Sequence, residues 1–105
     1  TPLYSSAASD VYKRQMHEFL RAYQEEGLPI QGEALGNLIG YFKPETGDIN
    51  RVIQLWGYAS FEDRAQRRAA LSNDPKWRAF LGKNAHMVEA QQVELLSAAP
   101  FSPIR

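Results

Sequence analysis

The chain has 105 residues, of which 44% are hydrophobic and 23% are charged, as expected for one globular domain. Its twelve basic and twelve acidic side chains cancel, so we expect neither nucleic-acid binding nor electrostatic attachment to a membrane. The lack of cysteine excludes disulfides, thiolate metal sites and a cysteine nucleophile. With no apolar run as long as a membrane span and no secretory signal pattern, a cytoplasmic location is the expectation.

The first fifteen residues differ in character from the rest. They show no alternation of apolar and polar side chains, and residues 10–15, DVYKRQ, resemble the in-frame translation of a transposon-end adapter used in sequencing libraries. We therefore expect residues 1–15 to be a non-native extension and residues 1–10 to lack stable packing. The alternative is a natural, divergent N-terminus. Tyr12 continues the apolar stripe of the next helix, so residues 11–15 could extend that helix.

Residues 16–105 show the periodicities of regular structure. An apolar stripe with helical spacing predicts a first helix, formed by Met16, Phe19, Leu20 and Tyr23. Gly27 is placed to end this helix, and Pro29 is expected to prevent its continuation.

Two short segments, Leu35–Lys43 and Arg51–Tyr58, are apolar on both alternating faces and flank the loop sequence PETGDIN. They predict a β-hairpin. Strands that are apolar on both faces are usually covered on both sides. Helices can cover one face, and a second copy of the chain is the simplest cover for the other, so we expect a homodimer joined face to face through its sheets.

The second half of the chain predicts two helical pieces and a strand. Ser60 is a candidate N-cap for a helix over Phe61–Leu71, and Asp74 with Pro75 begins another. Val88–Leu96 is predicted as a strand, followed by a proline-containing tail. The order helix, strand, strand, helix, strand is that of a ferredoxin-like βαββαβ unit without its first strand, an α+β fold.

Several segments together resemble the NIPSNAP family, whose domain belongs to the dimeric α+β barrels. They are EGLPIQ at 26–31, LGNLIGY at 35–41, Asn50, LWGY at 55–58, Asp63-Arg64, RRAAL at 67–71, Asp74-Pro75, Trp77, Gln91 and PFSP at 100–103. The resemblance implies a ferredoxin-like dimeric α+β barrel whose first β-strand is missing or replaced, because the YELR-x-Y strand that normally opens the family is not found. A chain without that central strand should aggregate or stay partly unfolded.

Three arginines near one helical edge form the first candidate site: Arg64, Arg67 and Arg68. Arg64 and Arg68 could form a fork for a carboxylate or phosphate. The alternative is a solvated face whose arginines pair with the nearby acids Glu62, Asp63 and Asp74.

Aromatic side chains form the second candidate site. Trp56 and Tyr58 share one face of their strand, with Tyr41 across the hairpin, and could line a cavity between sheet and helices. The alternative is core or dimer packing. His17 and His86 lack a recognisable catalytic pattern, and no metal site or cofactor motif is found.

Two functions remain open. The first is a homodimeric NIPSNAP-like module that binds a ligand or another protein, without established catalysis. The second is a small cofactor-independent enzyme of the dimeric α+β barrel type, such as a monooxygenase acting on quinol-like aromatics. Relatives often carry a histidine where Gln54 stands, which weakens a histidine base on that strand. A small aromatic or carboxylate-bearing ligand is expected in either case, and a polar group converging with aromatics in the pocket would favour the enzyme.

Overall fold

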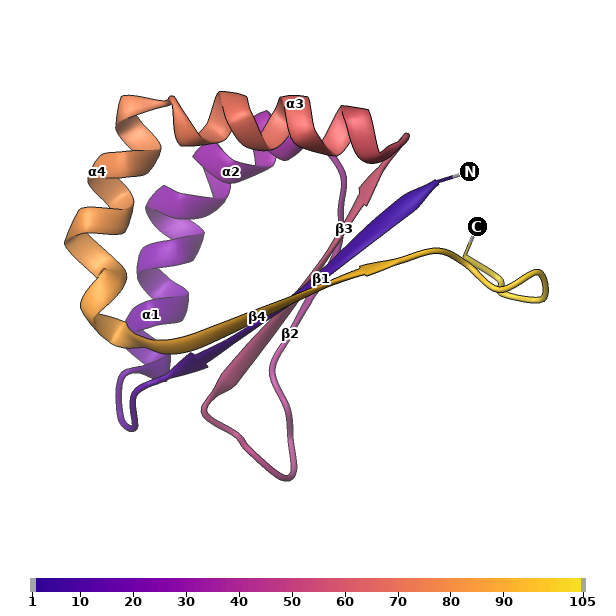
Figure 1. The fold of residues 1–105 in the computed structure, drawn as a ribbon. Coiled ribbons are helices and arrows are strands. Elements are labelled where there is room, and N and C mark those ends of the chain that lie inside the picture. The colour runs from indigo at the N-terminus through magenta and orange to yellow at the C-terminus, as the bar shows by residue number, and fades with distance from the viewer. Residues whose placement is uncertain (1, 105) are drawn as a thin grey trace.

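The computed structural model describes residues 2–104 and has helices on one face of a four-stranded antiparallel sheet (Figure 1). The strand order in the sheet is β2-β3-β1-β4. In chain order the elements are β1 (Leu3–Val11), α1 (Met16–Ala22), the π-helical segment η1 (Tyr23–Gly27), α2 (Leu28–Leu35), β2 (Leu38–Phe42), β3 (Arg51–Tyr58), α3 (Phe61–Ser72), α4 (Pro75–Asn84), the 3₁₀ turn η2 (Ala85–Met87) and β4 (Val88–Leu96). The ferredoxin-like α+β fold is confirmed. Thr1 and Arg105, which bound the two predicted regions, lie outside the described residues.

The prediction that residues 1–10 lack stable packing is wrong. Residues 3–10 belong to β1, a central strand that pairs antiparallel with β3 on one side and with β4 on the other. Leu3 and Val11 at its two ends are almost fully buried, and the small side chains of Ser5 and Ser9 are buried between them. A central strand needs backbone hydrogen bonds on both sides, and small side chains fit under the helices, so weak apolar alternation did not prevent the strand. The separate origin of residues 1–15 stays a prediction.

Residues 12–15 do not extend the first helix. They form the turn between β1 and α1, in which Arg14 adopts a positive φ of 74° and Tyr12 is 46% exposed. Because β1 supplies the strand that was expected to be missing, the reason for expecting a partly unfolded chain also falls away.

The first helix does not end at Gly27. It continues through η1 into α2 and ends at Leu35, before Gly36 with a φ of 88°. A proline ring inside a regular α-helix clashes with the carbonyl four residues earlier, and the wider π turn directly before α2 accommodates Pro29. Gly27 is needed for close packing, since a Cβ there would lie 2.7 Å from Phe80 Cζ and 2.9 Å from Tyr23 Cδ1.

The hairpin and the later elements follow the sequence closely. β3 and β4 have their predicted bounds, and β2 occupies the later part of its predicted segment, because Leu35 is the last residue of α2. The Ser60 hydroxyl accepts a hydrogen bond from the Asp63 backbone N–H at 3.0 Å, and the Asp74 carboxylate accepts one from Lys76 N–H at 2.8 Å. Both predicted helix N-caps are therefore confirmed.

The core lies between the sheet and the helices in two clusters. One is built around Leu3, Leu35, Trp56, Tyr58 and Leu71, and the other around Val11, Phe19, Val52 and Met87. Alternate residues of β3 point to the helices, which leaves Ile53 and Leu55 on the opposite face of the sheet. In Figure 1 no helix covers that opposite face.

Candidate functional site

A polar cleft lies between the helices and the sheet, in the gap between the two core clusters. It has two adjoining compartments of about 80 Å³ and 140 Å³. The compartments share lining residues from α2, β3, α4 and β4: Gln31, Gln54, Trp77, Leu81 and Gln91. At the mouth, Leu81 and Val93 are 44% and 49% exposed, whereas Gln31 and Gln54 in the interior are 6% and 7% exposed.

The π-helical segment brings Tyr23 and Gln31 together. In a regular α-helix, two residues eight positions apart point about 80° away from one another. The extra residue of a π turn reduces this difference to about 20°. As a result the Tyr23 hydroxyl donates a hydrogen bond to Gln31 Oε1, both groups being buried. The Tyr23 ring also stacks on Tyr41 with 4.8 Å between ring centroids.

The remaining amides are held by the strands and by α4. Gln54 and Trp56 are two residues apart on β3, and Gln54 Oε1 accepts a 2.8 Å hydrogen bond from Trp56 Nε1. Gln91 Nε2 on β4 donates to Ser9 Oγ at 3.0 Å, and Asn84 Nδ2 donates to the Phe80 carbonyl at 3.0 Å. A carboxamide has two donors and an acceptor, so these bonds use only part of its capacity. The cleft therefore presents fixed, neutral donors and acceptors between aromatic rings.

The tyrosines beside the cleft stay protonated at neutral pH. Burial raises the pKa of Tyr23 and of Tyr41 above the ordinary value of 10.0. The Gln54 amide partly offsets this rise for the Tyr41 pKa, but its geometry falls outside that of a hydrogen bond, and the buried Tyr41 hydroxyl has no hydrogen-bond partner among residues 2–104. Neither phenol is poised to act as a base near pH 7.

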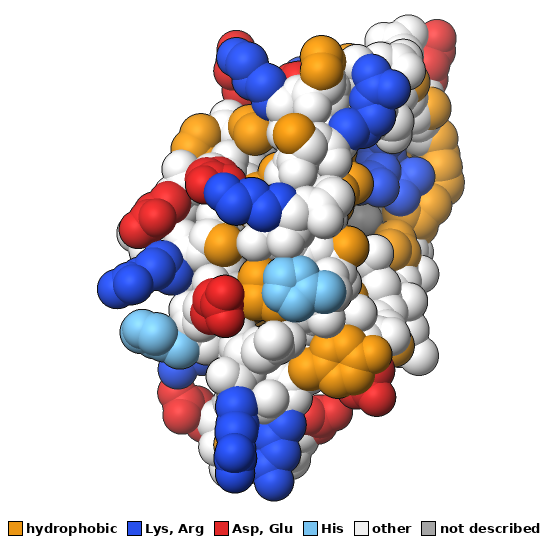
Figure 2. Space-filling view, turned by 90° about the vertical axis from the view of Figure 1, so that its left-hand side faces the viewer, with side chains coloured by type: hydrophobic (Ala, Val, Ile, Leu, Met, Phe, Trp, Pro, Cys, Tyr) orange, Lys and Arg blue, Asp and Glu red, His pale blue; other side chains and the backbone are white. Residues whose placement is uncertain are grey.

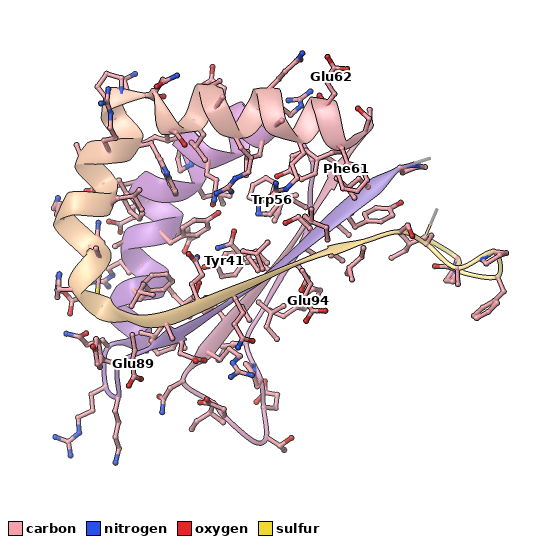
Figure 3. The ribbon with its side chains drawn as sticks, in the orientation of Figure 1. Tyr41, Trp56, Phe61, Glu62, Glu89 and Glu94 are labelled. Carbon is pink, nitrogen blue, oxygen red and sulfur yellow. The ribbon has the colours of Figure 1, made fainter. Side chains whose placement is uncertain are left out.

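The structure separates the five predicted site residues. Trp56 and Arg68 line the larger compartment of the cleft. Tyr41 packs behind it against Tyr23, and Figure 3 shows Tyr41 deeper between helices and sheet and Trp56 beneath α3. Tyr58 is buried in the core cluster that also contains Trp56, and it borders a separate open groove of about 540 Å³ at the end of the sheet.

Of the three arginines at 64, 67 and 68 in α3, Arg67 alone forms an ion pair within residues 2–104. Arg67 Nε lies 2.9 Å from Asp63 Oδ1, so the ion-pair alternative holds for this residue. In the described part of the chain, no carboxylate forms an ion pair with Arg64 or Arg68, and the buried Nε of Arg64 has no hydrogen-bond partner. Burial raises the pKa of Tyr58, and the positive charges of Arg68 and its neighbours oppose that rise.

Most of the polar lining of the cleft is not predicted as a site from the sequence alone. Gln31 and Gln91 were named only within the family motifs, Gln54 only as a departure from the family pattern, and Asn84 and the two serines of β1 not at all. The available signal was an amide within an otherwise apolar strand or helix face, as in RVIQLWGY. Amides at such positions are usually buried with a hydrogen-bond partner.

Other candidate groups lie outside the cleft. His17 and His86 are exposed, and Figure 2 shows histidine side chains at the surface among interspersed acidic and basic residues. Within residues 2–104, no group of three or more histidine and acidic side chains is arranged to hold a metal ion. Over the same residues, no helix is long and apolar enough to cross a membrane.

Comparisons with known proteins agree with the fold and its motifs. Residues 10–103 match the NIPSNAP family model. A solved NIPSNAP family protein from Agrobacterium tumefaciens is 38% identical, covers 100% of both chains and has a TM-score of 0.97. Human Protein NipSnap homolog 3B is 35% identical over 68 residues, which is 65% of this chain and 28% of that protein. The matched part thus spans little more than a quarter of that curated relative.

More distant structures share only the fold. A provisionally assigned antibiotic biosynthesis monooxygenase from Nitrosomonas europaea has a TM-score of 0.66 at 10% identity over 91% of this chain and 97% of that one. By its motifs and their order, by the family model that covers residues 10–103 and by its likeness to the Agrobacterium structure, the chain belongs to the NIPSNAP family.

Proposed function

We propose that this NIPSNAP domain is a ligand-binding module whose cleft takes a small, single-ring aromatic molecule. The observation that carries the proposal is the set of buried amides, Gln31 and Gln54 above all, held between the Trp56, Trp77 and Phe80 rings. Polar groups that are fixed by other side chains and still have unused donors favour recognition of a specific molecule. The cleft is smaller than the roughly 300–1,000 Å³ of pockets for drug-sized ligands, which favours a ligand of one ring.

A binding role is favoured over catalysis because the described lining of the cleft has no side chain suited to proton transfer near pH 7. No histidine, aspartate or glutamate is among the described residues that line the cleft, and the pKa of Tyr23 is raised by burial. Proton transfer near pH 7 is most effective from a group that titrates there. Gln54 supplies hydrogen bonds but cannot take up a proton at that pH.

The small-enzyme alternative keeps one specific observation in its favour. Polar groups do converge with aromatic rings in the cleft, as a cofactor-independent enzyme acting on quinol-like aromatics would need. The distant monooxygenase-type structures add a likeness of fold, and fold alone does not fix the reaction. Oxygen uptake with hydroquinone as substrate is therefore the discriminating assay.

Ligand binding can be followed with the two tryptophans of the chain, since Trp56 and Trp77 both line the cleft. Benzamide, a neutral single-ring probe, should quench their fluorescence saturably. Gln54→Met should weaken benzamide by roughly three- to tenfold through the lost hydrogen bonds. Gln66→Met on the exposed surface of α3 is the matched control and should leave the affinity unchanged. A fluorescence spectrum that benzamide leaves unaltered would refute the proposed binding function. Sustained oxygen uptake with hydroquinone would instead support the small-enzyme alternative.

We also propose that two copies associate through the sheet face that the helices leave open, in a cytoplasmic homodimer. Ile53 and Leu55 lie on that face, and Phe42, which pairs with Ile53, is 56% exposed. An apolar sheet face in water favours a second apolar surface as its cover. Sedimentation should give a dimer for the wild type and a monomer for Phe42→Glu. Phe61→Glu, at an exposed position on α3, should stay dimeric, and a monomeric wild type would refute the model.

A further inference from the structure

A single positive charge lies at the larger compartment of the cleft. Arg68 is the only residue with a full charge at neutral pH among the described residues that line its two compartments. Its side chain comes from α3 to the larger compartment, where Trp56, Gln31 and Gln54 form the inner wall. A ligand that fills this compartment is therefore in reach of one guanidinium group and of several neutral donors.

The charge of Arg68 is not neutralised within the part of the chain that the structure describes. The nearest acidic candidate on the same helix, Asp63, is paired with Arg67 at 2.9 Å. Arg68 itself is exposed where it reaches the larger compartment, and no described carboxylate forms an ion pair with it. Its guanidinium group is therefore available to the carboxylate of a ligand that binds there.

We infer that the cleft binds a single-ring aromatic carboxylate, with its ring between Trp56 and Trp77 and its carboxylate on Arg68. This inference rests on the proposed function and adds the charge of the ligand to it. A guanidinium group presents two parallel N–H donors that match the two oxygens of a carboxylate. The neutral amides of Gln31 and Gln54 bind the rest of the molecule without adding charge, so a monoanion balances the site.

The test compares benzoate with benzamide, which has the same ring and a neutral head group. Tryptophan fluorescence titrations should show that the wild type binds benzoate roughly tenfold more tightly than benzamide. This is near the lower end of what hydrogen bonds to charged groups contribute, because Arg68 is exposed at the mouth and solvent screens it. Arg68→Gln should abolish the preference, because it should lower the affinity for benzoate more than the affinity for benzamide.

Two further variants guard the interpretation. Arg68→Lys keeps the charge and loses the paired donors, so an intermediate preference is expected. Arg21→Gln removes an exposed arginine of α1 and should leave both affinities unchanged. Circular dichroism of each variant checks that the fold is retained.

The outcomes separate the two proposals. If neither probe binds, the proposed ligand-binding function fails. If both probes bind equally well and Arg68→Gln changes neither affinity, the cleft binds aromatics but the inferred carboxylate is overturned. Phenyl phosphate is the third probe, because arginine also binds phosphates. Tighter binding of phenyl phosphate than of benzoate would overturn the carboxylate in favour of a phosphate ester.

Discussion

Replacing Ala7 with proline should destabilise the whole domain, because Ala7 lies in the middle of the central strand β1. Its backbone is opposite Gln54 on β3 and opposite Val93 on β4. Proline has no N–H to donate to either neighbour, and its φ near −65° differs from that of an antiparallel strand. In central strands proline is therefore essentially absent.

The size of the effect follows from two contributions. A buried carbonyl that loses its donor costs about 1–3 kcal/mol, and a strained backbone costs about 1–3 kcal/mol more. The sum of about 2–6 kcal/mol is a large part of the 5–15 kcal/mol that stabilises a typical domain. With a urea m-value of about 1–3 kcal/mol/M, the unfolding midpoint should fall by about 1–3 M.

Urea unfolding followed by tryptophan fluorescence measures this change, since Trp56 is buried in the core and Trp77 packs against it. Thr46→Pro, in the exposed loop between β2 and β3, is the control and should shift the midpoint little. If Ala7→Pro and Thr46→Pro gave the same midpoint as the wild type, β1 would not be an integral strand. The prediction from sequence that residues 1–10 lack stable packing would then be correct.

Four further predictions concern single residues. Tyr41→Phe removes a buried hydroxyl without a partner among the described residues, so the free energy of unfolding at pH 7 should change by less than about 0.5 kcal/mol. Tyr23→Phe removes the hydroxyl that donates to Gln31, so it should lower the free energy of unfolding by about 1–3 kcal/mol. Because burial raises the Tyr41 pKa above 10.0, the unfolded chain loses the phenol proton at a lower pH than the folded chain does. The free energy of unfolding should therefore fall as pH rises above about 10, and it should fall less steeply in Tyr41→Phe than in the wild type. The same slope for both proteins in urea titrations would contradict this. Gly36→Ala should lower the free energy of unfolding by about 1–3 kcal/mol, since φ is 88° and a Cβ would lie 2.7 Å from a guanidinium nitrogen of α3. Gly82→Ala is the control, because there is open space around Gly82 in α4, and it should raise the melting temperature. The pKa of Asp63 is lowered below 3.8 by the backbone N–H and the arginine that its carboxylate binds. The stabilisation by Asp63 is therefore present above about pH 4 and is lost as pH falls through the pKa of the folded state. The stability difference between the wild type and Asp63→Asn should shrink in acid, and a difference that is constant with pH would refute this linkage.

Local chemistry in the sequence determined most of the elements. Ser60 and Asp74 begin helices because their side chains satisfy backbone N–H groups that a helix leaves unpaired. The strands over Arg51–Tyr58 and Val88–Leu96 were predicted with their observed bounds, since β-branched and aromatic residues favour pleated, half-buried backbone. The family was also identifiable from sequence, because its motifs occur in a fixed order along the chain.

Only the tertiary structure decided the central strand and the cleft. The segment that contains β1 has small side chains and little alternation, so its identity depends on the backbone hydrogen bonds that β3 and β4 provide from far along the chain. Gly27 and Pro29 predict a helix end locally, but packing of Phe80 against Gly27 stabilises a continuous helix with a π turn. That turn aligns Tyr23 with Gln31, and the meeting of such distant side chains creates the cleft. Spacing along the chain cannot reveal it, because the residues converge only after the sheet and helices have packed together.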